Sequence, residues 1–356
     1  MTKNEDLGGR LASLAPLRIG KETFAPIALA PMAGVSEMPY RIIAAEMGAG
    51  WTPTELVSAR GLEFGNQRTE TYLRHDPDRE PALTVQLYGA DPESMARAAE
   101  LSVQRGARIV DVNMGCPVKK ITKNQAGSAL LLQPERAETI VSAMVERLGD
   151  RASVTVKLRS GWDAQHINAP ELGRRLEAAG AAAITLHART RAQAYEGRAD
   201  WDLIRQLVDS VHAIPIIANG DIDGVSSAAA AIAQTGCAAV MVGRAALGNP
   251  WVFRELNRAW RGLSPAIPPG PRERVATILE HLDASVRHTG SEIRALHKFR
   301  QHLAWYSRGF RGGARFRDEV MTMSDRGSVE AAISRFFGTS SVLDPSEGVR
   351  YSAAYG

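Results

Sequence analysis

Short apolar segments recur through the first two thirds of the chain, and each closes on polar residues or glycine. Eight of them occur, most followed by a stretch with amphipathic helical spacing, at residues 27–32, 51–57, 82–87, 109–113, 154–158, 183–187, 214–218 and 238–242. Strands that alternate with amphipathic helices are typical of parallel α/β folds, and eight alternations favour a (β/α)8 TIM barrel. A doubly wound sheet is a weaker interpretation, because Pro31-Met32-Ala33-Gly34 does not supply the GxGxxG turn expected after its first strand.

The pattern breaks at residues 262–271, where GLSPAIPPGP holds four prolines and two glycines and rules out a continuous helix. We place a linker there, between a barrel domain at residues 17–261 and a small helical domain at residues 272–356. Helical spacing in the second domain predicts helices over 272–287, 292–305 and 328–337, whereas the glycine- and arginine-rich stretch 309–317 is expected as a loop. Residues 1–16 are expected to form a flexible lead.

Composition indicates a soluble enzyme of a reducing compartment. The chain has 356 residues, 44% of them hydrophobic, and no apolar run long enough for a membrane span or a signal peptide, so we expect a cytoplasmic protein with no membrane partner. Cys116 and Cys237 lie too far apart to suggest a zinc site or a disulfide framework, and no metal site is predicted. No obligate protein partner is evident.

Positive charge is concentrated towards the C-terminus. Residues 254–335 carry 15 Lys or Arg against 9 Asp or Glu, although the whole chain has a net charge of only +4. Within 287–317, eight basic residues are interleaved with five aromatic ones, which fits a polyanion with exposed bases. The alternative is that Phe299, Leu303 and Tyr306, which fall at helical spacing, form a core. In that case Arg294, Lys298, Arg308 and Arg311 would form the side that faces the polyanion.

Polar residues stand at the ends of most predicted strands, where TIM barrels place their active sites. They include Gln86, Asn113, Lys157, Arg159, His187 and Arg189. Asn219-Gly220-Asp221 and Gly243-Arg244 follow the last two strands, the usual position of a phosphate site in this fold. A phosphate there indicates a cofactor or substrate across the barrel mouth, and a planar redox cofactor fits the lysine and glutamine on the earlier strands.

Cys116 is the most distinctive candidate for chemistry. It follows a predicted buried strand and stands in the loop Gly115-Cys116-Pro117, whereas a structural cysteine normally lies within an apolar run. The cluster Lys119, Lys120 and Lys123 comes directly after it. These lysines could lower the pKa of the thiol or bind a phosphate backbone, and the sequence leaves both roles open.

Seven segments of the chain occur in a fixed order: APMAGVSEMPYR, VQLYG, DVNMGCPVKK with QAGSALL, KLRSGW, LHARTR, ANGDI and VMVGRAALGNPW. In this order they resemble the tRNA-dihydrouridine synthase family, in particular its bacterial B-type branch. The combination of NMGCPVKK with LHxRTR is the most specific part. Ala188 departs from the family, in which glycine is more usual.

The resemblance implies an FMN-dependent oxidoreductase acting on CH–CH bonds, in which NADPH reduces the flavin and the flavin reduces the C5=C6 bond of uridines in tRNA. Cys116 matches the general acid of the family, which protonates C5 after hydride reaches C6 from flavin N5. The implied substrate and RNA contacts are Asn113, the three lysines after Cys116, Arg189 and Arg191. The implied FMN contacts are Pro31, Met32, Ala33, Gln86, Lys157, His187, Asn219, Gly220, Asp221, Gly243 and Arg244.

Two other functions are compatible with parts of the sequence. An FMN barrel that reduces a free pyrimidine would keep Gln86, Lys157 and the phosphate loops but would not need the basic C-terminal domain. Removing the chain beyond Gly262 is expected to abolish activity on tRNA and to leave flavin binding intact. The second alternative is an RNA-binding or regulatory protein that uses the barrel as a scaffold, against which a yellow protein bleached by NADPH would argue.

Overall fold

The computed structural model describes residues 9–339, with Arg68 described by its backbone only. Its central feature is a sheet of eight parallel strands: β3 (Ile27–Leu29), β4 (Leu56–Ser58), β5 (Thr84–Tyr88), β6 (Ile109–Met114), β7 (Ser153–Arg159), β8 (Ala183–His187), β9 (Ile216–Asn219) and β10 (Ala239–Val242). Neighbours follow the order β3-β10-β9-β8-β7-β6-β5-β4. A bridge between Ala28 and Trp51 links β3 to the segment before β4 and closes the barrel. The predicted (β/α)8 barrel is therefore confirmed.

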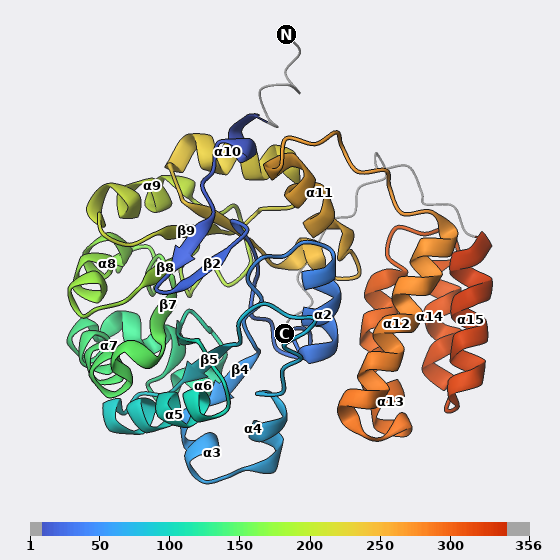
Figure 1. Cartoon of the computed structure of the whole chain (residues 1–356), viewed down its shortest axis with the longest axis horizontal. Coiled ribbons are helices and arrows are strands. Elements are labelled where there is room, and N and C mark those ends of the chain that lie inside the picture. The colour runs from blue at the N-terminus through green and yellow to red at the C-terminus, as the bar shows by residue number, and fades with distance from the viewer. Residues whose placement is uncertain (1–8, 340–356) are drawn as a thin grey trace.

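Helices surround the strands as an outer ring, which Figure 1 shows around the central arrows. They are α2 (Met38–Glu46), α3 (Ala59–Glu63), α4 (Gln67–Thr71), α5 (Pro92–Gln104), α6 (Lys119–Thr122), α7 (Pro134–Leu148), α8 (Ala169–Ala178), α9 (Trp201–Ser210), α10 (Val225–Thr235) and α11 (Trp251–Trp260), with 3-10 turns η1 (Gly127–Leu132), η2 (Gly149–Arg151) and η3 (Arg244–Ala246). Local signals set their ends. Asp91 caps α5 by accepting from Ser94 N at 2.8 Å, and Gly236 ends α10 with a φ of 68°.

A short hairpin closes the end of the barrel at which the strands begin. Strands β1 (Leu17–Ile19) and β2 (Glu22–Phe24) pair antiparallel across Gly20, whose φ is 58°. Leu17 and Ile19 are buried in one apolar cluster with the first residues of β6, β8 and β10. Ahead of the hairpin, residues 9–12 are helical and Leu11 is fully buried, whereas the rest of the expected flexible lead, residues 1–8, lies outside the described residues. The hairpin therefore covers this end of the barrel, and the opposite end, where the strands finish, is the expected place for a ligand.

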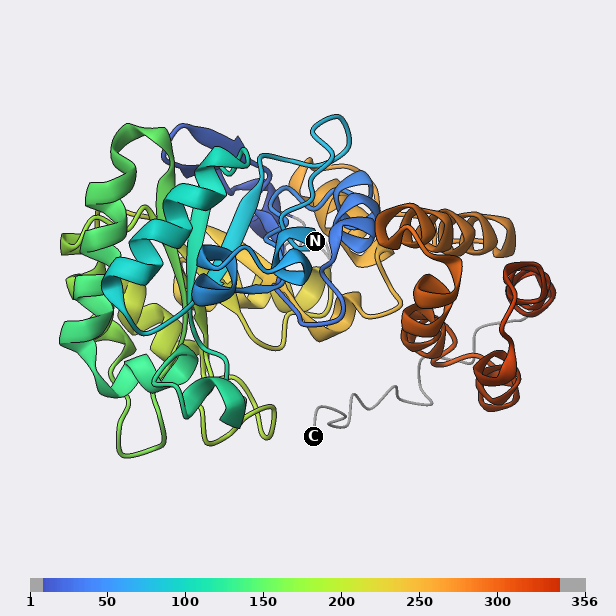
Figure 2. The same cartoon turned by 90° about the horizontal axis from the view of Figure 1, so that it is seen from below.

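Four helices follow the barrel: α12 (Pro271–Thr289), α13 (Glu292–Tyr306), α14 (Gly313–Thr322) and α15 (Arg326–Thr339). They lie together on one side of the barrel in both views (Figures 1 and 2), next to α2. Helix α14 corrects the expectation of a loop over 309–317: Gly312 and Gly313 lie at its start, and its apolar residues Phe316 and Val320 are buried. No helix within residues 9–339 has both the length and the apolar content needed to cross a bilayer.

The aromatic residues of the C-terminal helices form a core. Phe299, Tyr306, Phe310 and Phe316 are all buried in one apolar cluster with Leu303, and Trp305 is buried in the core of the barrel. These side chains therefore stabilise the helices and do not offer a surface for stacking bases. Any contact of this region with a polyanion depends on its basic residues.

Candidate active site

A cavity of about 1630 Å³ opens at the end of the barrel where the strands finish. Of the residues predicted for a cofactor, all except Gln86 line it: Pro31, Met32, Ala33, Lys157, His187, Asn219, Gly220, Asp221, Gly243 and Arg244. Asn113, Cys116, Lys119, Arg189 and Arg191 line it as well. Ligand pockets usually measure about 300–1000 Å³, so this cavity has room for a cofactor and a second molecule together.

The other predicted residues lie elsewhere. Gln86 is fully buried within the barrel wall, behind the cavity surface. Lys120 and Lys123 lie at the exposed helix α6, just beyond the rim. The four basic residues predicted on the C-terminal helices, Arg294, Lys298, Arg308 and Arg311, are not among the cavity residues.

Hydrogen bonds connect the barrel interior to the loop that carries Cys116. Asp111 on β6 accepts from Thr155 Oγ1 at 2.6 Å and from Gln86 Nε2 at 2.7 Å. Gln86 Oε1 accepts from Asn113 Nδ2 at 3.0 Å, and Asn113 Oδ1 accepts from the backbone N–H of Cys116 at 3.0 Å. Both ends of the Gln86 amide are therefore occupied within the wall, and the chain of bonds fixes where the cysteine backbone lies.

Burial raises the pKa of the Cys116 thiol above its usual value, although Arg159 and Lys157 partly oppose this. The thiol therefore stays protonated at neutral pH. A protonated thiol is suited to donating a proton rather than to nucleophilic attack. The lysines that follow it lie on an exposed turn and do not reverse this effect.

The floor of the cavity is strongly basic. Seven of its lining residues are Lys or Arg, and two are Asp. Burial, followed by the neighbouring charge of Arg159, lowers the pKa of Lys157 to about 8, and the Lys157 ammonium donates to Asn219 Oδ1 at 3.0 Å. Burial, reinforced by the charges of Arg159 and Lys157, holds the pKa of His187 well below its usual value, so the imidazole is neutral at pH 7.

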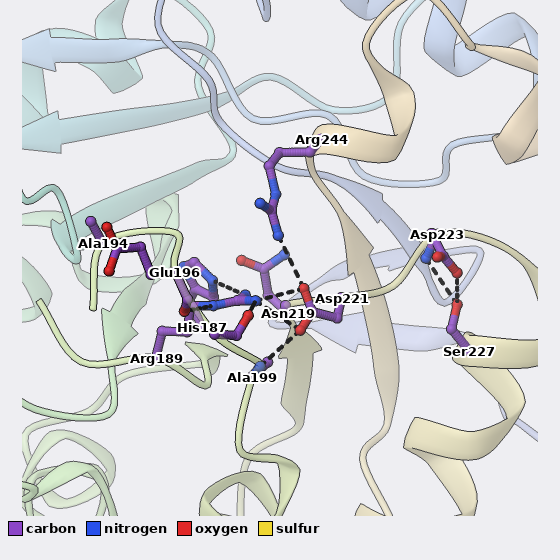
Figure 3. A network of polar contacts seen from close by, with 12 residues as sticks. His187, Arg189, Ala194, Glu196, Ala199, Asn219, Asp221, Asp223, Ser227 and Arg244 are labelled. Atoms are coloured by element: carbon purple, nitrogen blue, oxygen red, sulfur yellow. Dashed lines mark hydrogen bonds and ion pairs between the residues drawn. The ribbon is translucent and has the colours of Figure 1, made fainter. Parts of the chain in front are cut away.

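Arg189, from the loop after β8, and Arg244, from the loop after β10, both bond to Asp221 in the loop after β9 (Figure 3). Arg189 donates to both carboxylate oxygens of Asp221 at 2.8 Å, and Arg244 donates to Oδ1 at 3.0 Å. Partial burial opposes ionisation of Asp221, but the N–H of Ala199 and the two arginines outweigh it and lower its pKa. Arg189 is only 1% exposed and also donates to the carbonyls of Glu196 and Gly197, so it positions the loop as well as Asp221.

Gly220 provides the space in this corner. Its φ is 111°, and a Cβ there would lie 2.8 Å from Ala199 Cβ and 3.1 Å from His187 Cδ2. A larger residue is therefore excluded by both its backbone conformation and its neighbours. Arg244 retains guanidinium nitrogens beyond the one bonded to Asp221, which leaves donors for a phosphate.

Two residues of the site were not assigned a role from the sequence. Arg159 is buried and donates to three backbone carbonyls: Gly115 O at 2.8 Å, Thr190 O at 2.9 Å and Ala194 O at 2.7 Å. It therefore joins the Cys116 loop to the loop after β8. Tyr195 on the second loop places its ring 5.5 Å from the Arg159 guanidinium and 5.7 Å from that of Arg244. Arg159 follows Lys157 by two residues on one strand, so its side chain could be predicted on the same face as that of Lys157. No pattern in the sequence indicated a role for Tyr195.

Arg191 lies at the cavity rim with an unused donor. Its guanidinium lies 4.5 Å from the centre of the Trp162 ring, and its buried Nε has no hydrogen-bond partner among the described residues. Buried N–H groups without a partner are rare, because each costs free energy. A bound ligand with acceptor oxygens would satisfy it.

Comparison with known proteins identifies the family. The chain is 36% identical over 322 residues to a probable tRNA-dihydrouridine synthase of Rickettsia conorii, covering 90% of this chain and 96% of that one. It is 37% identical to tRNA-dihydrouridine synthase B of Pseudomonas aeruginosa, covering 91% and 96%, and 36% identical to the B enzyme of Escherichia coli K12, covering 86% and 94%.

Solved structures with a similar fold are more distant in sequence. Histamine dehydrogenase from Rhizobium sp. 4-9 matches with a TM-score of 0.55 at 13% identity, over 78% of this chain and 51% of that one. 2-Naphthoyl-CoA reductase matches with a TM-score of 0.57 at 12% identity, over 71% and 53%. These likenesses establish the fold. The family model described as "Dihydrouridine synthase (Dus)" matches residues 28–339, and the chain therefore belongs to the dihydrouridine synthase family.

Proposed function

We propose that this protein is a flavin-dependent tRNA-dihydrouridine synthase that reduces the C5=C6 bond of uridines in tRNA, using FMN that NADPH has reduced. The observation that carries the proposal is the composition of one cavity. A protonated thiol, Cys116, a buried amine, Lys157, and the Arg244 guanidinium all line it. Relatives named tRNA-dihydrouridine synthase, 36–37% identical over most of the chain, support the same substrate.

The described residues fit FMN. Arg244 and the backbone at Gly220 would hold the phosphate at the corner after β9 and β10. Pro31, Met32 and Ala33 would contact the ring from the loop after β3, with His187 and Asn219 on the other strands. When bound and reduced, the flavin supplies the hydride that adds to C6 of the uracil. Gln86 would act indirectly in this arrangement, because its amide is already bonded to Asp111 and Asn113.

Lys157 would balance negative charge on the flavin. Its ammonium bonds to Asn219 and faces the cavity, and its pKa of about 8 keeps most of the molecules protonated at neutral pH. A fixed cation beside a ring that gains electrons stabilises the reduced form. The neutral His187 would offer a hydrogen bond without adding a further charge.

Cys116 would supply the proton. The hydride brings two electrons to C6, and the C5=C6 pair then takes a proton at C5 from the thiol, which leaves a thiolate to be reprotonated by solvent. The raised pKa of the thiol keeps the proton available at neutral pH. Asn113 would hold the loop in place through the N–H of Cys116 and would contact the uracil edge.

RNA would reach this cavity with a uridine rotated out of its stack, at a cost of about a few kcal/mol that backbone contacts must offset. The proposed contacts are Lys119, Lys120, Lys123 and Arg191 at or near the rim, and Arg294, Lys298, Arg308 and Arg311 on the C-terminal helices. Arg189, which was expected to contact RNA, is 1% exposed and bonded to Asp221, so it would act only by positioning that corner. Arg308 and Arg311 have no carboxylate partner within the part of the chain that the structure describes, whereas Lys298 pairs with Glu37 at 2.6 Å. Arg294 is exposed and bonds there only to the carbonyl of Thr289, so Arg294, Arg308 and Arg311 are more available for phosphate than Lys298.

Two measurements test the proposal. The purified protein should be yellow, and NADPH should bleach it under anaerobic conditions. Adding tRNA from a strain that lacks dihydrouridine should then restore the colour and produce dihydrouridine detectable by mass spectrometry. Faster reoxidation by free uridine than by tRNA would favour a small-molecule reductase, and a colourless protein that binds no FMN would contradict the proposal altogether.

A further inference from the structure

Helix α13 contacts the loop that follows the phosphate-binding strand β10. Gly248 lies in this loop with a φ of 69°, and a Cβ there would lie 2.5 Å from Tyr306 N and would overlap the carbonyl group of Trp305. The last turn of α13 and the loop therefore meet backbone to backbone, with no side chain between them. Trp305 itself is buried in the core of the barrel.

Tyr40 on α2 makes a second connection at the same place. Its hydroxyl donates to the carbonyl oxygen of Ala246, the last residue of η3. Its ring lies 5.4 Å from the His281 ring on α12 and stacks at 5.8 Å on the His302 ring on α13. One side chain thus joins the turn that begins with Arg244 to both C-terminal helices.

The loop after β3 faces the same helix. Lys298 on α13 forms an ion pair with Glu37 at 2.6 Å, next to the start of α2. Gln301, one turn further along α13, has its Oε1 3.6 Å from the Cβ position of Gly34. Strands β3 and β10 are neighbours in the sheet, so α13 lies behind both of the loops that follow them.

We propose that α13 forms an outer wall of the cofactor site, with Tyr40, Gly248 and Trp305 as positioning residues for the turn that presents Arg244. The inference rests on the proposed flavin function. Arg244 and Ala246 are the first and last residues of the three-residue turn η3, so a displacement of α13 would move the guanidinium relative to the phosphate. Because coupling between two sites is reciprocal, FMN stabilises the docking of α12–α15, and RNA that shifts these helices changes the affinity for FMN.

A pair of glycine variants separates this contact from backbone strain. Gly248→Ala places a methyl group against α13, whereas Gly262→Ala introduces the same unfavourable conformation, at a φ of 66°, with nothing within 4 Å. We expect the first to raise the Kd for FMN at least about fivefold in titrations of the apoprotein, as a coupling of this kind predicts. The second should leave the Kd unchanged. The 31P resonance of bound FMN should shift in the first variant only.

Tyr40→Phe is the second variant, because it keeps the ring and removes only the donor to Ala246. It should also weaken FMN binding, with an unchanged circular dichroism spectrum, and it decides the matter if Gly248→Ala does not fold. In the wild type, FMN should increase protection of the α13 amides from hydrogen exchange. If Gly248→Ala and Tyr40→Phe bind FMN as tightly as the wild type does, the inference about α13 is wrong and the proposed function stands. If the wild type binds no FMN, the proposed function is wrong as well.

Discussion

Replacing Lys157 by methionine should stabilise the unliganded protein while removing a group that the proposed function needs. The two side chains have similar length, so the change mainly removes a buried charge. Burial and the nearby Arg159 lower the pKa of this lysine from 10.5 to about 8, which means that the fold holds the ammonium at a cost.

The size of the effect follows from two opposing contributions. Each pKa unit corresponds to about 1.4 kcal/mol, so the shift represents a destabilisation of about 3 kcal/mol at pH 7. The hydrogen bond from Lys157 to Asn219 Oδ1, 3.0 Å long, is lost in the variant, at a cost of about 1–2 kcal/mol. The free energy of unfolding should therefore rise by about 1–2 kcal/mol.

The pH dependence provides the sharper test. Between pH 8 and 10.5 the unfolded chain keeps a proton on this lysine that the folded chain has lost, so wild-type stability rises across that interval. The penalty is complete below pH 8. The advantage of the methionine variant should therefore be largest at pH 7, should vanish before pH 10.5 and should then reverse, because the cost of the lost hydrogen bond remains.

Urea unfolding of the apoprotein at several pH values between 7 and 10, followed by circular dichroism, measures this difference. Lys120→Met, at an exposed position on α6, is the matched control and should show no such trend. A difference between variant and wild type that stays constant with pH would refute the reasoning, since the hydrogen-bond contribution alone has no such dependence. The same variant should bind FMN more weakly and should be reduced by NADPH more slowly.

Three further predictions concern function. Cys116→Ala should keep flavin reduction by NADPH and lose uridine reduction by about 10²-fold or more, measured by single-turnover reoxidation, and because burial raises the pKa of the thiol, the wild-type rate should not fall between neutral and mildly alkaline pH. Arg308→Ala and Arg311→Ala should each weaken tRNA binding whatever the tRNA sequence, and each should reduce the slope of log K against log salt concentration by about one in filter-binding titrations. Arg335→Ala is the control and should have little effect, because Arg335 already pairs with Glu319. Ending the chain after Gly262 was expected from the sequence to leave flavin binding intact, but the packing of α13 on the loop after β10 predicts lower flavin retention as well as lost activity on tRNA, and a truncated protein with unchanged flavin content would contradict the proposed role of α13.

Local patterns in the sequence were sufficient to predict the barrel. Each of the eight predicted strands overlaps an observed one, because the spacing of apolar residues and the flanking glycines depend only on residues close by in the sequence. The rule that parallel strands end on one face then brought Lys157, Asn219 and Arg244 into one cavity without any knowledge of side-chain contacts. By contrast, the hairpin at residues 17–24 was missed, because strands of three residues leave almost no periodic signal.

Contacts between distant loops could not be predicted in the same way. Arg159 bonds to the carbonyls of Gly115, Thr190 and Ala194, and a backbone carbonyl carries no mark in the sequence. Gln86 was expected at the cofactor because it stands near the end of a strand. In the structure it is fully buried, and Asp111 and Asn113 of the next strand bond to its amide, a contact that no local pattern predicts.

The linker at residues 262–271 invited the interpretation of two independent modules. Proline-rich segments do interrupt helices, and the structure has no regular element from 263 to 270. A break in regular secondary structure, however, indicates only where two parts of the chain are joined. It does not show whether the surfaces of the two parts are buried against each other. Trp305 belongs to the barrel core, while Trp251 of the barrel belongs to the core of the C-terminal helices. Each part therefore completes the core of the other, and the packing allows the helices that we propose to bind RNA to adjust the proposed cofactor site.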